Sequence, residues 1–232
     1  MYNMIINGFN TNTIPFCVVT DFGDIQGAKP RTLETDTIYG ANGKYPILDG
    51  AYDGYERTFK FYVAKYDDAT NIVNQFKDDR NELEFGYQLG SIFYCGSPEI
   101  KITPNGPHAW ELEIKVDMQP FRYMKSVNDV VLVANGLVDN KGTIYSEPIL
   151  VVEGNGECSI TIGKQTMVLN VNRKATIDCR HRYQNIYDQN NNVKNTSRVR
   201  GTFFTIPVGR TGVALSTNIT KLTIKGNWRY KI

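Results

Sequence analysis

The clearest alternation of apolar and polar residues runs from Glu147 to Cys179, EPILVVEGNGECSITIGKQTMVLNVNRKATIDC, with breaks at Gly-Asn, Gly-Lys and Asn-Arg. A period of two, interrupted by turn residues, is typical of antiparallel strands in a β-sandwich. One buried face is predicted, made of Ile149, Val151, Ile160, Ile162, Val168 and Val171. The residues expected to face solvent are Glu153, Thr161 and Asn170. No reaction chemistry is visible between 147 and 232, so we expect this protein to act through its surfaces.

The first half of the chain predicts a different architecture, in which strands are joined by one helix. The strands are expected at 2–6, 16–20, 31–39, 57–65, 83–85, 91–102 and 109–118. A helix is predicted over Asp67–Arg80, with Asp67 or Asp68 as its N-cap. Its apolar residues fall at i, i+3, i+4 and i+7, namely Ala69, Ile72, Val73 and Phe76. The segment is therefore α+β, an antiparallel sheet with one helix against it.

The stretch Gly40–Tyr55, GANGKYPILDGAYDGY, is dense in turn residues and predicts a protruding hairpin or an ordered loop. Tyrosine is enriched in protein interfaces because it buries much area at little entropic cost. The tyrosines either pack under the loop or contact another subunit. The candidates for subunit contacts are Tyr39, Tyr45, Tyr52 and Tyr55.

A boundary between two domains is expected within Met118–Asp129, which contains a proline and loses strand periodicity. This divides the chain into 1–125, an N-terminal α+β domain, and 126–232, a C-terminal β-sandwich. In the second part, further strands are expected at 130–133, 144–145, 203–208, 213–216 and 222–228.

The polar segment Arg182–Arg200 interrupts these strands and is expected to be an exposed, mobile loop. We consider it a candidate partner-binding loop, through Arg182, Tyr183, Tyr187, Asp188, Arg198 and Arg200.

Charge changes sign along the chain although the formal net charge is only +2. Residues 1–125 carry 12 Lys/Arg and 17 Asp/Glu, and residues 126–232 carry 14 and 7. The imbalance suggests two domains and contacts between copies, or two ordinary solvated surfaces. A net charge near zero does not favour nucleic-acid recognition. The N-terminus lacks the features of a signal peptide, and no segment approaches the roughly 20 apolar residues of a membrane span.

The residue types that support catalysis or metal binding are sparse. Four cysteines, Cys17, Cys95, Cys158 and Cys179, lie far apart without a CxxC pair, which favours buried free thiols over a disulfide. Two histidines offer few zinc ligands, and no pair of carboxylates stands out. We expect no enzyme activity, no metal and no cofactor.

Two motifs resemble known ligand loops but lack required residues. GKQT at Gly163 lacks the earlier glycine of a phosphate loop, so a hairpin turn is expected. DQNNNV, from Asp188, lacks the glycine and glutamate of a calcium loop, so a polar surface loop is expected. Sugar binding by the sandwich remains open, through Tyr183, Tyr187 and Trp228, although core packing is favoured for Trp228.

Several segments, in order along nearly the whole chain, resemble the distal tail protein family of bacteriophages with long non-contractile tails. They are FCVVTDFGDI (Phe16–Ile25), Gly40–Tyr45, Thr58–Val63, Gln119–Tyr123, Tyr145–Gly163, Lys174–Cys179, Ile206–Ser216 and Trp228–Tyr230. PVGRTG, from Pro207, departs from the family pattern and leaves the shape of that loop open.

The resemblance implies a homo-hexameric ring at the tip of the tail, built by the N-terminal domains, with galectin-like C-terminal sandwiches. Such a ring joins the tail tube protein to the tail-associated lysin or spike and supports the receptor-binding protein. The implied location is the virion, after assembly in the host cytoplasm. The chain has no room for the inserted carbohydrate-binding module of some members. The alternative function is a carbohydrate-binding β-sandwich that recognises host cell-wall glycan, and a hydrolase ranks third.

Overall fold

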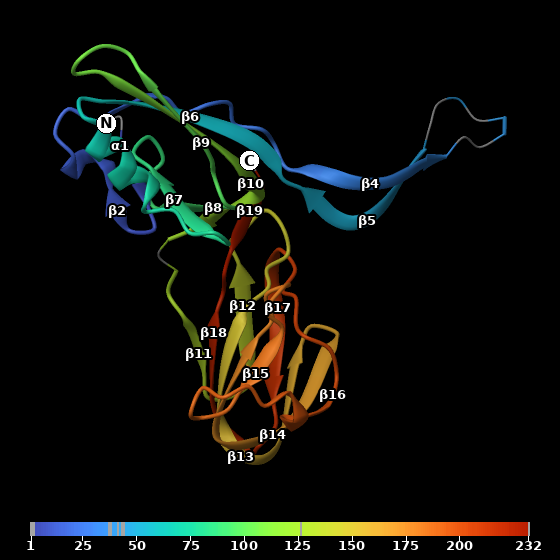
Figure 1. Ribbon diagram of the computed structural model, residues 1–232. Coiled ribbons are helices and arrows are strands. Elements are labelled where there is room, and N and C mark those ends of the chain that lie inside the picture. The colour runs from blue at the N-terminus through green and yellow to red at the C-terminus, as the bar shows by residue number, and fades with distance from the viewer. Residues whose placement is uncertain (1–2, 37–38, 41, 43–44, 126, 232) are drawn as a thin grey trace. The chain divides into compact units, whose positions relative to one another are not determined.

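The protein is mainly β, as the sequence predicts, with one α-helix among the residues described (Figure 1). The computed structural model describes all residues except 1–2, 37–38, 41, 43–44, 126 and 232. The chain divides into two compact units. The first unit is Met1–Arg122 with Lys231–Ile232, and the second unit is Tyr123–Tyr230.

The first unit is an antiparallel sheet in the order β2-β1-β7-β8-β10-β6-β3, and β9 also pairs with β10. Alternation places one face of β6 in the core, with Phe59, Phe61 and Val63 fully buried. The strands are β1 (Met4–Ile6), β2 (Phe9–Asn10), β3 (Val18–Asp21), β6 (Tyr55–Val63), β7 (Asn81–Phe85), β8 (Ser91–Cys95), β9 (Glu99–Pro104) and β10 (Trp110–Met124). A short 3-10 helix, η1 (Thr11–Thr13), follows β2.

The α-helix is shorter than the sequence predicts, and its cap differs. α1 (Tyr66–Val73) buries Ala69 and Ile72 in the core of the first unit. Its N-cap is Lys65, which makes no side-chain capping bond, so the prediction of an aspartate cap is wrong. The predicted helix would have reached residue 80. Instead, the carbonyl of Gln75 accepts from Nδ2 of Asn7 at 2.8 Å, and the backbone N and carbonyl of Lys77 are bonded to the side chain of Asn81.

Asn81 is completely buried and organises this corner of the first unit. Its Oδ1 accepts from the backbone N of Lys77 at 2.7 Å and from Nδ2 of Asn7 at 2.8 Å. Its Nδ2 donates to the carbonyls of Lys77 and Gly96, each at 2.9 Å. All four hydrogen-bonding positions of the amide are therefore used, and they join segments from three parts of the chain.

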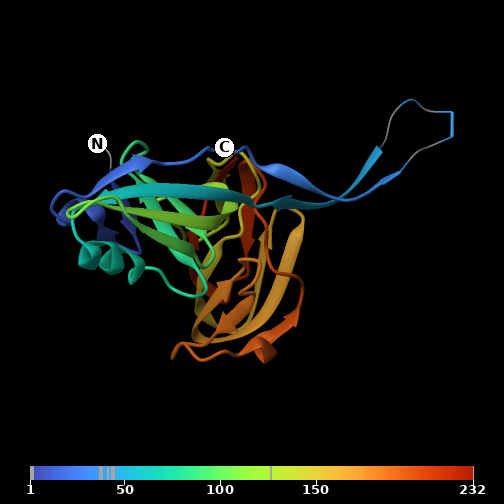
Figure 2. The same ribbon diagram turned by 45° about the horizontal axis from the view of Figure 1, so that its top comes forward.

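A hairpin stands where the turn-rich stretch predicts one. β4 (Lys29–Asp36) and β5 (Tyr45–Asp53) pair only with each other in a two-stranded sheet, with register shifts near Thr32. Both views show it as a ribbon apart from the other strands of the first unit (Figures 1 and 2).

The second unit is built on one long hairpin. β13 and β14 pair continuously from Ile149–Asp178 to Ile162–Gln165. The sheet order is β11-β18-β13-β14-β15, with β17 joining β12 and β13, and β16 on β14. The strands are β11 (Val130–Leu132), β12 (Gly136–Asn140), β13 (Ile149–Ile162), β14 (Gln165–Asp178), β15 (Asn185–Tyr187), β16 (Arg198–Arg200), β17 (Gly209–Leu215) and β18 (Ile219–Lys225). The last strand, β19 (Arg229–Lys231), does not join this sheet and pairs with β10.

The turn of the long hairpin is Gly163–Lys164, as expected for GKQT. Gly163 has a φ of +59°, which suits the first position of a two-residue hairpin turn.

Part of the predicted buried face of β13 is wrong. Leu150 and Val152 are fully buried, whereas Ile149 and Val151 are only partly buried. The prediction assumed a turn at Gly154–Asn155. Such a turn would have allowed odd-numbered residues before it and even-numbered residues after it to share one buried face. β13 instead continues through these residues, so the even-numbered positions stay inward up to Ile160 and Ile162.

The predicted positions on β14 and the outward residues agree better with the structure. Val168 and Val171 are both buried, although they lie on opposite faces of the strand. Asn170 is exposed, and Glu153 and Thr161 are partly exposed.

Each unit has its own cluster of buried apolar residues. All four cysteines are free thiols, as predicted, and Cys95, Cys158 and Cys179 are buried. Burial raises the pKa of Cys95 and of Cys179 to about 12.

We expect Asn81→Ala to destabilise the first unit by about 3 kcal/mol, because it leaves several buried polar groups unpaired. Hydrogen exchange at 77–85 should accelerate roughly hundredfold, as measured by mass spectrometry. The control is Asn105→Ala, at an exposed asparagine of the β9–β10 turn. Equal exchange in the two variants would contradict this role of Asn81.

We also expect stability to fall above a pH of about 9. The unfolded thiols titrate at about 8.5, whereas Cys95 and Cys179 keep their protons until about 12. The unfolded state therefore binds fewer protons in this window, which costs about 1.4 kcal/mol per pH unit for each thiol. Urea unfolding from pH 8 to 11 measures the slope. Cys179→Ala should flatten it, and an unchanged slope would refute the assignment.

Candidate functional site

The ribbon of β4 and β5 presents apolar side chains to solvent. Leu33, Ile47 and Leu48 are 60%, 46% and 51% exposed, and Tyr39, in the connection between the strands, is fully exposed. We call these four residues the hairpin surface. A two-stranded ribbon has no core of its own beneath it, so such residues favour contact with another protein.

The four tyrosines predicted to contact other subunits occupy different environments. Besides exposed Tyr39, Tyr52 is partly buried and packs edge-on against Phe121 at 5.2 Å between ring centroids. Tyr55 is 8% exposed and belongs to the core of the first unit. The side chain of Tyr45 lies outside the described part of the structure. The structure therefore brings Tyr39 alone of the three described side chains to an open surface.

The segment Arg182–Arg200 contains ordered elements, namely β15, the 3-10 helix η2 (Asn195–Ser197) and β16. Asp188 forms a turn, in which its Oδ1 accepts from the backbone N of Asn190 at 2.8 Å and of Asn192 at 3.0 Å. The hydrogen bond from Asn192 is the main reason that the pKa of Asp188 lies below its usual value. Asp188 thus has a structural task within its own loop.

The other candidates for partner binding do not gather at one point. The ring of Tyr183 lies 4.6 Å from the guanidinium of Arg180. Tyr187, in β15, pairs with Thr176 of β14. Arg198 lies over the ring of Phe203 at 5.1 Å. Arg182 and Arg200 are exposed. The segment offers a basic, aromatic surface but no single site made of the predicted residues.

A pocket of about 260 Å³ in the second unit includes one residue of this segment, Gln184. It is lined by Tyr145, Glu147, Cys179, His181, Gln184, Phe203, Phe204 and Thr205. The lining residues come from three segments, 145–147, 179–184 and 203–205. The first segment precedes β13 and the second follows β14, so they meet at the open end of this hairpin, where Ile149 pairs with Asp178. Segment 203–205 is held next to segment 145–147 by two backbone hydrogen bonds of 2.8 Å between Ser146 and Ile206.

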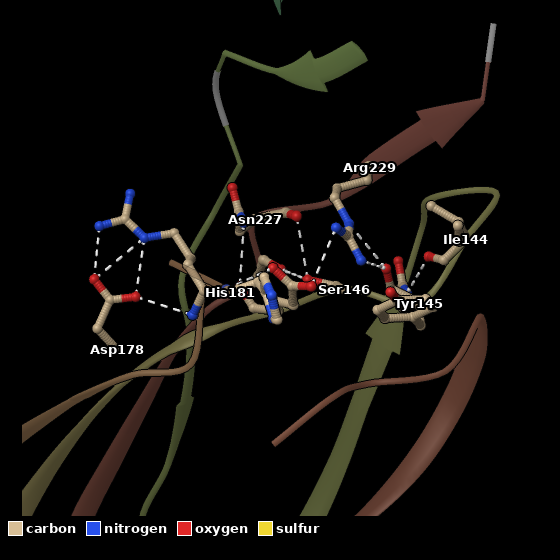
Figure 3. A network of polar contacts seen from close by, with 11 residues as sticks. Ile144, Tyr145, Ser146, Asp178, His181, Asn227 and Arg229 are labelled. Carbon is tan, nitrogen blue, oxygen red and sulfur yellow. Dashed lines mark hydrogen bonds and ion pairs between the residues drawn. The ribbon is translucent and has the colours of Figure 1, made fainter. Parts of the chain in front are cut away.

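A network of polar contacts fixes one wall of the pocket (Figure 3). The carboxylate of Glu147 lies 3.3 Å from Nη1 of Arg229, and both side chains are largely buried. Its other oxygen accepts from the backbone N of His181 at 2.9 Å. Arg229 donates to the carbonyl of Tyr145 from Nε at 3.1 Å and from Nη2 at 2.8 Å, and its guanidinium lies 4.5 Å from the centre of the Tyr145 ring.

Further hydrogen bonds hold the backbone of this wall. Nδ2 of Asn227 donates to the carbonyl of Glu147 at 3.1 Å, and the Ser146 hydroxyl donates to the carbonyls of Asn227 and Gly226. Each of these bonds joins residues about 80 positions apart. The wall is therefore preorganised by the fold of the second unit.

A second ion pair lies at the end of β14, next to the pocket residue Cys179. Arg180 binds Asp178 through Nε and Nη2, at distances between 2.7 and 3.2 Å. Burial raises the pKa of Cys179, next to this pair, to about 12. A thiol with so high a pKa is protonated near neutral pH and is a poor nucleophile.

No pattern in the sequence marks the lining residues as a site. Glu147, His181 and Phe203 belong to segments that are separated by more than 20 residues, and none stands in a recognisable motif. Trp228, considered for sugar binding, is 4% exposed and packs in the core, as favoured.

The described residues contain no group of three or more His, Cys, Asp or Glu placed to hold a metal ion. In the same part of the chain, no helix has the length and apolar character needed to cross a membrane.

Comparison with known proteins adds the fold. No family model and no curated protein sequence matches the chain. The structure is similar to the crystal structure of the Dit protein (gp 19.1) of phage SPP1, described as a paradigm of the hub adsorption apparatus in phages that infect Gram-positive bacteria. The TM-score is 0.68 at 12% identity, over 100% of this chain and 99% of the SPP1 chain. The chain has the fold of a phage tail hub protein.

A second phage structure is also similar. It is a chain of the phage P2 baseplate in its activated conformation with Ca, with a TM-score of 0.57 and 10% identity over 100% and 99% of the two chains. The resemblance inferred from the order of sequence segments is thus confirmed at the level of the fold.

We expect Gly201→Ala to detach β16 from β14. Gly201 has a φ of +98°, and a Cβ there would lie 2.2 Å from the carbonyl oxygen of Thr166. The matched control is Gly209→Ala, where φ is +85° but no atom lies within 4 Å of the added Cβ. Both variants carry backbone strain, so their difference isolates the clash. Limited trypsin digestion at Arg198 and Arg200 should be roughly tenfold faster in Gly201→Ala. Equal rates would show that β16 tolerates the clash.

Proposed function

We propose that this protein is a structural component of a bacteriophage tail tip, a distal tail hub rather than an enzyme. In this proposal, six copies form a ring that joins the tail tube to the tail-associated lysin or spike and to the receptor-binding apparatus. The observation that carries the proposal is the fold shared with the SPP1 hub protein over the whole length of both chains. The proposed location is the virion, after assembly in the host cytoplasm.

The proposal assigns a different task to each part of the chain. Residues 1–125 form the ring, and residues 126–232 form a galectin-like β-sandwich that supports other tail-tip proteins. The ordered Arg182–Arg200 segment is the proposed partner-binding surface of the sandwich, since it exposes Arg182, Arg198 and Arg200.

A closed ring needs two different patches on each copy, because each patch meets the other patch on the next copy. The hairpin surface is our proposal for one of these patches, with Tyr45 and Tyr52 next to it in β5. Its exposed Leu33, Ile47 and Leu48 would lose contact with water in the ring, which favours association. Tyr55 lies in the core and would act by holding the start of β6, which follows the ribbon directly in the chain.

Light scattering over a concentration series tests the ring. We expect the mass to rise from one protomer towards six, because association follows mass action. A monomer at every concentration would contradict the proposal.

The triple variant Leu33→Ser/Tyr39→Ser/Ile47→Ser tests the hairpin surface. We expect it to raise the concentration at which half of the protein is assembled by at least about tenfold. The control is Val131→Ser/Val133→Ser, which changes valines of the second unit that are 53% and 73% exposed. If both variants assemble like the unchanged protein, the hairpin surface is not an interface.

A further inference from the structure

We propose that the pocket of the second unit binds one uncharged sugar ring. This inference goes beyond the hub function and does not depend on it. It rests on the size of the pocket, its pairing of aromatic with hydrogen-bonding side chains, and the neutralisation of its only carboxylate.

The volume limits the ligand to a small molecule. A pocket of about 260 Å³ is below the range of roughly 300–1,000 Å³ that holds drug-sized ligands. It corresponds to about eight or nine water molecules of liquid volume. A single six-membered ring with its hydroxyl groups is of this size, and a longer chain would have to leave through the mouth.

Two aromatic residues supply apolar surface to one side of such a ring. Phe203 and Tyr145 both line the pocket and are partly exposed. The guanidinium groups of Arg198 and Arg229 lie over these two rings, at 5.1 and 4.5 Å from their centres. In this proposal, the ligand contacts the part of each ring that its arginine does not cover. The C–H face of a sugar packs well on such surfaces because both are apolar there.

Polar side chains around the aromatic rings provide donors and acceptors for hydroxyl groups. His181 and Gln184 are exposed at the pocket. The hydroxyl of Thr205 accepts from Nε2 of Gln165 at 3.1 Å, so its own proton is left to donate. An amide, an imidazole and a hydroxyl together match the mixed donor and acceptor character of a sugar.

The charges favour an uncharged ligand over an amine or a phosphate. Glu147 is the only carboxylate among the eight lining residues, and Arg229 already neutralises it at 3.3 Å. The same eight residues include no lysine or arginine, and the guanidinium of nearby Arg229 is already bonded to Glu147 and to the carbonyl of Tyr145. The network around Ser146 and Asn227 fixes this wall before a ligand arrives, which lowers the entropic cost of binding.

Saturation-transfer NMR on the full-length protein tests the proposal. The probes are glucose, galactose, rhamnose, N-acetylglucosamine and N-acetylgalactosamine, with ethanolamine and glycerol phosphate as charged probes. For a ligand of about a dozen heavy atoms, we expect a dissociation constant in the millimolar range for at least one sugar. We expect no transfer to the charged probes.

The double variant His181→Ala/Gln184→Ala removes two polar side chains from the pocket while leaving the backbone N–H of His181 on Glu147. We expect binding of that sugar to weaken roughly tenfold or more. The matched control makes the same changes at exposed positions outside the pocket, His108→Ala/Gln189→Ala, and should bind like the unchanged protein.

Three outcomes would overturn the inference. They are transfer to none of the sugars, transfer only to a charged probe, and equal binding by the two double variants. Light scattering on the same samples separates this result from the proposed hub function. If the protein assembles but binds no sugar, the proposed hub function stands and the sugar site is rejected. If it stays a monomer but binds sugar, the sugar site stands and the proposed ring is rejected.

Discussion

The continuous pairing of β13 with β14 is the constraint on which the second unit depends. β17 and β18 attach to β13, and β15 and β16 attach to β14, so the register of this one hairpin places every neighbour. A slip by one residue would turn Leu150, Val152, Ile160 and Ile162 away from the core. The turn at Gly163–Lys164 fixes that register locally, and burial of the inward face makes other registers costly.

The pocket is a direct consequence of the same pairing. Since Ile149 lies opposite Asp178, the residues just outside the hairpin, Glu147 and His181, are necessarily neighbours. Arg229 closes the arrangement from the end of the chain and satisfies the buried carboxylate. A buried ion pair of this kind contributes little net stability but strongly disfavours loss of either partner. The strand scaffold thereby holds a concave, hydrogen-bonding surface without a dedicated loop.

The first unit combines a buried core with an exposed apolar ribbon. Its sheet is secured by satisfied polar groups such as Asn81, which joins the start of β7 to the segment after α1 and to the segment after β8. The ribbon of β4 and β5 has no such cover, and Leu33, Ile47 and Leu48 face solvent. In the proposed ring, another copy would cover this apolar ribbon.

The sequence by itself determined most strands, the Gly163 turn, the ribbon, the free cysteines and the resemblance to tail hub proteins. These follow from period-two alternation, turn chemistry and the order of short segments, all of which are local. It did not determine that β13 continues through Gly154, that α1 ends at Val73, or that eight lining residues form a pocket. Only the tertiary structure decided these features, because hydrogen bonds and ion pairs between residues distant in the chain outweigh local preference.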